Sequence, residues 1–377
     1  MIAERRASRW GLVASVVWLV LVLVVDVLNP GPTFALTVLY AVAPLIACAV
    51  LPPTWTATVA AVATVMAVAS GGWNLTWGTA QHAVRIVDVV LVGAGAVAIA
   101  AIRDRREQQV ARLSAIADVA QRAILPVLPT HAGPVAVAAR YLSAAEDTMV
   151  GGDLYDCYRY ISRTSGDTER VRFIVGDVRG KGITGVEQAA RVIRAFRQSA
   201  AVEPTLPLVA QAMDQYLRDF FGPEEFVTAV LVDVSDASRI ELVNCGHPPA
   251  LLHRAGGRSG LVEAPTGLPL GLGFDGSGSY EQVVVPWDPA DRLLLYTDGL
   301  SEARNRGGQF LSPLALEPAM NESDVTEVMD AVMAAVTGHI PGARLADDLA
   351  LLLLECAAPT AAPEPSIDAD LRATYLA

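Results

Sequence analysis

The chain carries little charge for its length. Asp, Glu, Lys and Arg make up 18% of its 377 residues, whereas about a quarter is usual for a soluble domain. The charge also lacks a positive excess, because 28 Lys and Arg stand against 40 Asp and Glu, for a formal net charge of −12. A protein that binds nucleic acid through the phosphate backbone needs a basic face. This balance therefore argues against a nucleic-acid-binding protein.

Cysteine is scarce as well. The chain has 4 cysteines, and no two of them form a Cys-x-x-Cys pair: Cys48, Cys157, Cys245 and Cys356. A disulfide framework or a zinc site needs a characteristic cysteine spacing, so neither is predicted. Cys245 is interpreted as a small buried residue. Scattered cysteines of this kind fit a reduced compartment for the soluble part of the chain.

Apolar residues, in contrast, are abundant and are concentrated in the first hundred positions. Hydrophobic residues make up 53% of the chain, and the mean hydropathy is +0.39. A helix that crosses a bilayer needs about 20 apolar residues, and these stretches approach that length: 10–28, 34–51, 54–71 and 84–102. A cleavable signal peptide would explain only the first of them. We therefore expect a transmembrane region at 1–102 with four helices, three or five being the alternatives.

The positive charges that flank these stretches predict their orientation. Arg5, Arg6 and Arg9 precede the first stretch, and a cluster of arginines follows the last. The loops at 29–33 and 71–82 contain neither Lys nor Arg. Lys and Arg gather at the cytoplasmic ends of transmembrane helices. We therefore expect a multi-pass protein of the cell membrane, with its N-terminus and the whole region after the last helix in the cytoplasm.

A charged, helix-forming segment at 103–125 follows the membrane region, and Pro126 ends it. Its apolar residues are spaced by three and four positions, as on one face of a helix: Val110, Leu113, Ala117, Ala120 and Ile124. The stripe covers barely two heptads, so two interpretations stay open. One is a coiled coil with a second copy of the chain, and the other is a linker helix packed on the following domain. In both cases the segment is a candidate switch between the membrane region and that domain.

Residues 126–357 combine short apolar stretches of strand type with amphipathic helical stretches. Strands in series, interrupted by paired helices, indicate an α+β fold with antiparallel sheets rather than a βαβ alternation. Residues 358–377 are rich in Ala, Pro and acidic residues, which is typical of a disordered tail. We therefore predict an α+β domain at 126–357 and a tail after it.

Four aspartate motifs stand at the ends of apolar stretches in this domain. They read GGDLYD at 151–156, GDVRGKG at 176–182, TDG at 297–299 and ADD at 346–348. A single Asp beside Gly is usually a turn or a helix cap. Carboxylates from four such motifs would repel one another unless a cation lay between them, and clustered carboxylate oxygens suit Mg²⁺ or Mn²⁺. The sequence offers no cluster of Cys and His for zinc.

These motifs occur in order with NCGHPPALL at 244–252, LLLYTDGLSEAR at 293–304 and LADDLALLLLE at 345–355. Together they resemble the SpoIIE-like bacterial branch of the protein phosphatase 2C (PPM) superfamily. The resemblance implies a PPM-type β-sandwich flanked by helices (α-β-β-α), with two Mn²⁺ or Mg²⁺ ions in a cleft at one edge. It does not extend to the membrane region.

The resemblance also implies which residues bind the metals. Asp177 would bridge both ions, and the backbone carbonyl of Val178 would add a ligand. Asp153 would bind one ion, and Asp298 and Asp347 would bind the other. These four aspartates are the expected catalytic residues.

Other residues have less specific interpretations. Asp348 falls where the wider superfamily often has Asn and is expected to support the ligands, and Asp156 is a candidate outer ligand through water. Arg179 and Lys181 either contact the substrate phosphate or are solvated loop charges. His247 either fixes a turn between two strands, which is the favoured interpretation, or donates a proton.

The reaction that the resemblance implies is hydrolysis of phosphoserine or phosphothreonine in a protein, without a covalent intermediate. The usual substrates of this branch are phosphorylated STAS-domain anti-sigma-factor antagonists in bacterial partner-switching pathways. We therefore expect a membrane-anchored, metal-dependent serine/threonine phosphatase that acts on such a partner in sigma-factor regulation. If the apolar stripe is a coiled coil, the chain forms a homodimer through 103–125. The alternative is a catalytically inactive PPM-like module that docks a signalling partner, but all four aspartates are present.

Overall fold

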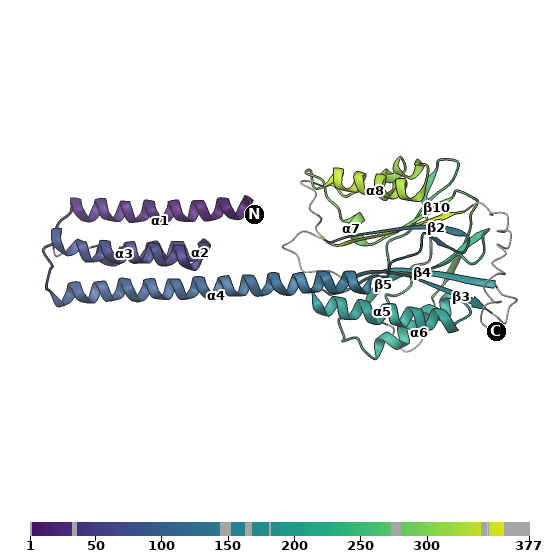
Figure 1. Cartoon of the computed structure of the whole chain (residues 1–377), viewed down its shortest axis with the longest axis horizontal. Helices are drawn as coiled ribbons and strands as arrows, with labels where there is room; N and C mark the ends of the chain where they lie inside the picture. The colour runs from purple at the N-terminus through teal and green to yellow at the C-terminus, as the bar shows by residue number, and fades with distance from the viewer. Residues whose placement is uncertain are drawn as a thin grey trace, which may run out of the picture. The chain divides into compact units, whose positions relative to one another are not determined.

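The computed structural model describes residues 2–31, 36–143, 152–162, 168–180, 182–272, 280–340, 345 and 347–357. The chain forms two compact units, Met1–Arg112 and Leu113–Ala377. The long helix α4 (Ala80–Ile124) contributes to both of them (Figure 1). The boundary between the units falls inside the predicted linker at 103–125, and the predicted tail at 358–377 lies outside the described residues.

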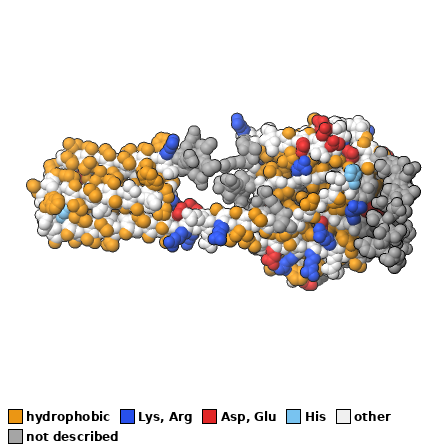
Figure 2. All heavy atoms as spheres, viewed as in Figure 1, with side chains coloured by type: hydrophobic (Ala, Val, Ile, Leu, Met, Phe, Trp, Pro, Cys, Tyr) orange, Lys and Arg blue, Asp and Glu red, His pale blue; other side chains and the backbone are white. Residues whose placement is uncertain are grey.

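The first unit is a bundle of apolar helices. It contains α1 (Ile2–Leu28), the 3-10 turn η1 (Thr37–Ala41) with α2 (Val42–Val50), α3 (Pro53–Trp73) and the first part of α4. In the described part of the chain, three helices are long and apolar enough to cross a membrane: Ser8–Leu28, Pro53–Trp73 and Ala80–Gln121. Figure 2 shows hydrophobic side chains over the visible face of this unit and Lys and Arg at one end of it. So extensive an apolar surface is typical of contact with lipid.

The second apolar stretch differs from the expectation of a full transmembrane helix. It is helical only over Thr37–Val50, because it opens with a 3-10 turn and Pro44, which has no N–H, lies in the first turn of α2. At 1.5–2 Å per residue this segment spans about 24 Å, less than the ~30 Å of a bilayer core. The segment lies along α1 between Asp26 and Gly11. The N–H of Leu36 donates to Asp26 near the end of α1 (3.2 Å), and Val50 contacts Gly11.

Polar contacts close both ends of the bundle. At one end Asp26 is fully buried and accepts hydrogen bonds from Tyr40 Oη (3.4 Å), Trp73 Nε1 (2.9 Å) and Asn74 Nδ2 (3.1 Å). At the other end the Arg103 guanidinium of α4 donates to the carbonyl groups of Cys48 in α2 (2.6 Å) and of Leu51 directly after it (2.8 Å). A carboxylate in an apolar bundle is stable only when hydrogen-bonded. These bonds therefore hold α1, η1 and α3 together at one end.

The second unit is a sandwich of two antiparallel sheets. Among the described residues, one sheet has the order β1-β2-β11-β10-β7-β8 and consists of β1 (His131–Ala132), β2 (Val135–Leu142), β7 (Leu251–His253), β8 (Ser259–Leu261), β10 (Arg292–Tyr296) and β11 (Leu349–Cys356). The other has the order β3-β4-β5-β6-β9 and consists of β3 (Asp153–Ser162), β4 (Thr168–Val178), β5 (Val227–Asp233), β6 (Arg239–Cys245) and β9 (Gln282–Pro286).

Helices cover the outer face of each sheet (Figure 1). The β3-containing sheet carries α5 (Ile183–Val202) and α6 (Leu206–Arg218), and the other sheet carries α8 (Val325–His339) and the short helices α7 (Asp298–Ser301), η2 (Pro313–Leu316) and η3 (Ala319–Asn321). Alternation along β4 sends Phe173 and Val175 into the core between the sheets and Ile174 into the core under α5. The predicted α-β-β-α architecture is thereby confirmed.

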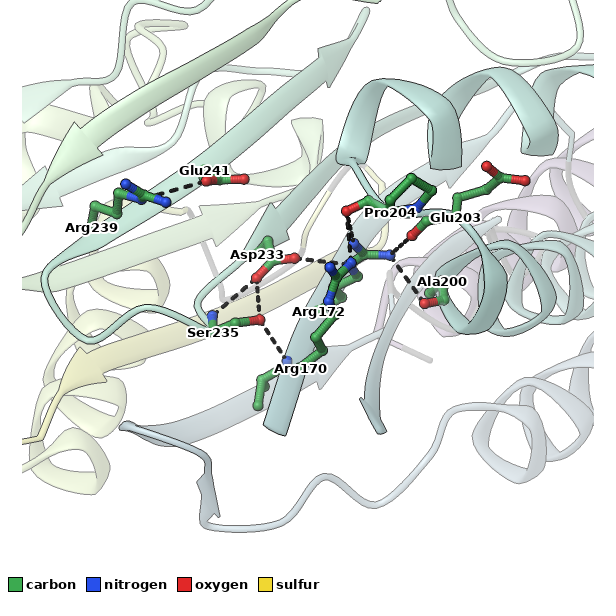
Figure 3. Close-up of polar contacts among 10 residues, drawn as sticks. Arg170, Arg172, Ala200, Glu203, Pro204, Asp233, Ser235, Arg239 and Glu241 are labelled. Atoms are coloured by element: carbon green, nitrogen blue, oxygen red, sulfur yellow. Dashed lines mark hydrogen bonds and ion pairs between the residues drawn. The ribbon is translucent and has the colours of Figure 1, made fainter. Parts of the chain in front are cut away.

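A buried arginine fastens α5 to the sheet beneath it (Figure 3). Arg172 on β4 is 1% exposed and donates from Nε to Asp233 on β5 (2.8 Å). Its terminal nitrogens donate to the carbonyl groups of Ala200 (3.0 Å), Glu203 (2.7 Å) and Pro204 (3.0 Å). Carbonyl groups at a helix C-terminus lack partners within the helix. The arginine therefore satisfies them and places a positive charge at the negative end of the helix dipole.

The last turns of α4 belong to this second unit. Ala117 and Val186 of α5 form a small buried cluster, and Ala120 and Ile124 pack against it. These three α4 residues come from the predicted apolar stripe, so the end of the helix packs on the domain that follows it. The stripe is exposed nearer the start of the segment, at Leu113, and the apolar side chains of Ile116 and Val119 on an adjacent side of the helix are exposed as well.

Candidate functional site

Strand register brings two of the predicted ligands side by side. Asp153 of β3 pairs with Asp177 of β4, which in turn pairs with Thr228 of β5. Residues directly opposite one another on antiparallel strands point to the same face, with Cβ atoms about 4.5–5.5 Å apart. That face lies between the sheets, because the same alternation places Val175 in the inter-sheet core. The two carboxylates are therefore neighbours at one edge of the sandwich.

The opposite sheet supplies the other aspartates at the same edge. The N–H of Thr297 donates to the Ala350 carbonyl (3.1 Å), and the Ala350 N–H donates to Thr297 Oγ1 (2.9 Å). This exchange joins the residue after β10 to the start of β11. A Cβ on Gly299 would lie 2.0 Å from the carbonyl oxygen of Asp348, so only glycine allows α7 to approach so closely. Asp298 and the pair at 347–348 are thus held next to each other.

A side-chain bond connects the two sheets at this edge. The buried Thr297 hydroxyl donates to Asp153 Oδ2 at 2.6 Å. Because Thr297 immediately precedes Asp298, the bond places the ligands of the two sheets side by side. The structure therefore brings five predicted site residues together: Asp153, Asp177, Asp298, Asp347 and Asp348.

The electrostatics of the cluster reflect this crowding. Burial, followed by repulsion from Asp177, raises the pKa of Asp153 well above its ordinary value, against the opposing effect of the Thr297 hydrogen bond. Burial, followed by repulsion from Asp298, raises the pKa of Asp177 to about 7. Like charges in a poorly solvated site disfavour ionisation. A divalent cation would relieve the same repulsion.

Two further contacts shape the cluster. The buried Asp348 accepts hydrogen bonds from the hydroxyl groups of Tyr141 and Ser143 at the end of β2, an arrangement that suits a supporting residue. A Cβ on Gly152 would lie 2.3 Å from the carbonyl oxygen of Val178. Glycine at this position lets the start of β3 pack directly against the backbone of Val178, whose carbonyl group is a predicted metal ligand.

The donor set of the cluster fits a hard divalent cation, because it consists of carboxylate oxygens with a backbone carbonyl beside them. Within the residues that the structure describes, no three His, Cys, Asp or Glu side chains are positioned so that they could bind one metal ion together. A divalent cation would neutralise carboxylates that repel one another at such short range. The residues present therefore fit the metals that the sequence predicts.

The structure does not bring Asp156 into this cluster. It lies three residues after Asp153 on β3 and therefore on the opposite face of the strand. It is fully buried there and accepts hydrogen bonds from Arg197 of α5, with Nε to Oδ2 at 2.6 Å and Nη2 to Oδ1 at 3.0 Å. Its position assigns Asp156 to the attachment of α5, in place of the outer metal ligand expected from the sequence.

The two predicted phosphate contacts have different outcomes. Arg179 is exposed directly after Val178, and its guanidinium lies over the ring of Phe226, with Cζ 5.4 Å from the ring centroid. It is therefore available at the edge of the cluster but is not drawn into it. Lys181 lies outside the described residues.

His247 has the contacts expected of a turn residue. Its N–H donates to Asn244 Oδ1 (2.8 Å), and Asn244 Nδ2 donates back to its carbonyl group (2.8 Å). Burial lowers the pKa of the imidazole to about 4, so the ring is neutral near pH 7. A neutral, buried ring is a poor source of a proton, and this argues against the alternative of a proton donor.

Sequence reasoning missed two residues that hold Asp153. One is Thr297, whose hydroxyl binds the carboxylate. The other is Gln121 of α4, which is buried and donates from Nε2 to the Asp153 carbonyl (3.0 Å). A signal for Gln121 existed, since a polar residue stands between Ala117 and Ile124 on the face of the helix that packs on the domain.

Comparisons with known proteins agree with this geometry. The family model of Stage II sporulation protein E (SpoIIE) matches residues 167–357, just over half of the chain. Phosphoserine phosphatase RsbP of Bacillus subtilis is 29% identical over 167 residues, which cover 43% of this chain and 39% of RsbP. The chain thus spans about two fifths of the length of this curated relative.

Solved structures show similar folds. The SiaA-PP2C domain of Pseudomonas aeruginosa matches with a TM-score of 0.50 and 20% identity, over 68% of this chain and 99% of that domain. The RsbU and RsbW domains of Rv1364c from Mycobacterium tuberculosis match with a TM-score of 0.49 and 27% identity, over 63% of this chain and 62% of that one. The SiaA-PP2C match shows the PP2C fold. The SpoIIE model covers β4 to β11 and includes Asp177, Asp298 and Asp347, and the chain belongs to the SpoIIE family.

Proposed function

We propose that this chain is a metal-dependent protein serine/threonine phosphatase anchored in the cell membrane. The observation that carries the proposal is the convergence of carboxylates from both sheets at one edge of the sandwich, with the Thr297–Asp153 bond between the sheets. Membership of the SpoIIE family supports this reading, as does the similarity to RsbP, which is named a phosphoserine phosphatase. An inactive docking module would have no need for such an arrangement of repelling, buried acids.

The site residues would hold two Mn²⁺ or Mg²⁺ ions. Asp177 would be shared by both, Asp153 would serve one, Asp298 and Asp347 would serve the other, and the Val178 carbonyl would add a ligand. Two such ions neutralise the charge of a phosphate monoester and activate water for in-line attack. The position of Asp177 supports its central role, because it is flanked by Asp153 in its own sheet and feels the charge of Asp298 from the opposite one.

Residues around the ligands keep them oriented and ionised. The Thr297 hydroxyl donates to Asp153 and opposes the rise of its pKa, so it favours the carboxylate form that binds a cation. Tyr141 and Ser143 hold Asp348, whose N–H in turn donates to Asp347 Oδ1 (3.0 Å). This chain of bonds sets the direction of the Asp347 side chain before any substrate binds.

We propose that the first unit crosses the membrane with both of its chain ends in the cytoplasm. The contact of Gly11 with Val50 and the bonds of Arg103 to the end of α2 support this, because they place the start of α1 and the exit of α4 at one end of the bundle. A reporter fused after Arg106 is expected to read cytoplasmic, and one inserted near Asn74 to read external. An external reading at Arg106 would refute this topology.

We propose a phosphorylated STAS-domain anti-sigma-factor antagonist of a partner-switching pathway as the substrate, on the strength of the family resemblance. The test uses the full-length protein in nanodiscs and a panel of phosphorylated STAS proteins, with release of phosphate as the readout. Hydrolysis that needs Mn²⁺ or Mg²⁺ and stops with EDTA is the expected result. A protein that binds phosphorylated STAS partners but releases no phosphate with either metal would favour the inactive module.

We also propose that α4 carries regulation to the site. Two contacts support this, the packing of Ala117 on Val186 and the hydrogen bond from Gln121 to the Asp153 backbone. A shift of the helix would therefore move a metal ligand directly. The exposed residues Leu113 and Val119 offer an apolar face for a second copy of the chain, which supports a homodimer through 103–125.

A further inference from the structure

One buried histidine connects the two sheets next to the carboxylate cluster. His247, in the turn after β6, is 4% exposed. Its Nε2 lies 3.0 Å from the carbonyl oxygen of Tyr296, at the end of β10. Its Nδ1 lies 3.1 Å from Thr228 Oγ1 on β5. Since β10 and β5 belong to different sheets, the imidazole bridges the sandwich.

The chemistry of its partners assigns the tautomer of the ring. A carbonyl oxygen only accepts, so Nε2 carries the proton and donates to Tyr296. In the neutral ring Nδ1 has no proton, and it therefore accepts from the Thr228 hydroxyl. Both nitrogens are satisfied in this single form. In a charged imidazolium Nδ1 would instead donate to the Thr228 hydroxyl, but burial holds the ring neutral.

Each end of this bridge adjoins a proposed metal ligand. Tyr296 lies two residues before Asp298 on the same backbone, and Thr228 stands directly opposite Asp177 in the register of β4 and β5. The ring therefore links the strand that delivers Asp298 to the position beside Asp177. The Thr297–Asp153 bond is a second link between the same sheets, and the two bridges lie on either side of Asp177 in the register of β3, β4 and β5.

The ring is itself held by its turn. The reciprocal bonds with Asn244 fix the backbone of His247. Gly246 adopts φ +76°, and a Cβ on it would lie 2.8 Å from Pro269 Cγ. Only glycine fits such a position without strain, so the turn presents the imidazole in one orientation. The bridge is rigid before any ligand binds.

From this geometry we propose that His247 is a positioning residue that fixes the separation of the two sheets at the cluster and thereby sets its affinity for divalent cations. The inference rests on the proposed function, because it assumes that Asp177 and Asp298 share a metal site. Without the imidazole, the Thr297–Asp153 bond is the one of these two bridges that remains, and the spacing between Asp177 and Asp298 is less firmly fixed. Loss of groups that orient metal ligands typically weakens metal affinity about 10–100-fold.

The test is the Mn²⁺ affinity of the full-length protein in nanodiscs, measured by isothermal titration calorimetry. His247→Ala is expected to bind Mn²⁺ about 10–100-fold more weakly than the wild type. Thr228→Val keeps the shape of the strand but removes the hydroxyl that bonds Nδ1, and it is expected to show a smaller loss. His247→Gln can still donate to Tyr296 and is expected to recover part of the affinity. The matched control is His253→Ala, because His253 is also buried but bonds Ser259 on β8.

The outcomes separate this inference from the proposed function. Absence of Mn²⁺ binding in the wild type would contradict the metal site itself. If the wild type binds Mn²⁺ and both His247→Ala and Thr228→Val bind it with unchanged affinity, the positioning role is overturned. The phosphatase proposal would still stand. An equal loss in His253→Ala would also overturn it, since any buried histidine would then suffice. If His247→Ala does not fold, the affinity of Thr228→Val alone decides.

Discussion

Replacing Arg172 with methionine is predicted to destabilise the second unit more than any change to a surface ion pair. Methionine keeps the aliphatic stem in the core but removes the guanidinium that bonds Asp233 and three carbonyl groups at the end of α5 (Figure 3). Asp233 is then a nearly buried carboxylate without its cation, and its side chain is only 12% exposed.

The contacts give the size of the effect. Removing one partner of a buried ion pair costs about 3–5 kcal/mol. The Ala200 carbonyl is buried and stays unpaired, whereas Pro204 is exposed and water replaces its bond, so we expect about 4 kcal/mol, within that range. For a unit of this size each kcal/mol lowers the melting temperature by about 2–4 °C, which predicts a fall of about 8–16 °C. Adding Asp233→Asn removes the orphaned charge and should recover about 1–3 kcal/mol.

The measurement is the melting temperature of the full-length protein in nanodiscs by calorimetry, with hydrogen exchange on α5 and β4 peptides to report this unit alone. Arg239→Met is the control, because Arg239 is half exposed and lies 3.4 and 3.5 Å from its acidic neighbours. It should change stability by less than about 0.5 kcal/mol. If Arg172→Met melts within about 2 °C of the control, the argument from buried charge is refuted.

Two further predictions concern the acidic cluster and α4. Aspartate carboxyl groups in the unfolded chain have a pKa near 3.9, and folding raises the pKa of both Asp153 and Asp177. Between about pH 4 and 7 the folded protein therefore binds more protons than the unfolded chain. Its stability must fall as the pH rises through that window. In EDTA the melting temperature of the wild type should therefore be lower at pH 8 than at pH 5, and this difference should be smaller in Asp177→Asn. Equal melting temperatures of the wild type at the two pH values would contradict the crowding of these acids. On α4, Ala117→Asp should disturb packing on α5 and change turnover, whereas Leu113→Asp should reduce self-association in membranes without touching that packing. If neither variant changes either property, the helix is a passive tether.

Much of the fold and the gathering of the acidic side chains could be predicted because local patterns carry them. Apolar strands that end in Asp and Gly point to carboxylates at strand ends, and the structure gathers the predicted ligands at one edge. The prediction of Asp156 as an outer metal ligand was wrong, although strand alternation decides its position. The strand begins at Asp153, and a residue three positions further along points to the opposite face of the sheet. The polar Gln121 beside the apolar stripe was a signal of a specific role, but its partner and the partners of His247 could not be predicted, since each contact joins segments far apart in sequence. The shortness of the second helical segment of the first unit depends on a 3-10 turn that hydropathy does not reveal.

The most direct test of the central claim is the Mn²⁺-dependent release of phosphate from a phosphoserine protein by the wild type and by Asp177→Asn. Asp177 is flanked by Asp153 within its sheet and feels the charges of Asp298, Asp347 and Asp348 from the other, so it is the ligand whose loss should affect both ions. The account predicts hydrolysis by the wild type only when Mn²⁺ or Mg²⁺ is present, and a loss of more than about 100-fold in the variant, which should remain folded. Activity of Asp177→Asn within about tenfold of the wild type would contradict the assignment of this cluster as a metal-dependent active site.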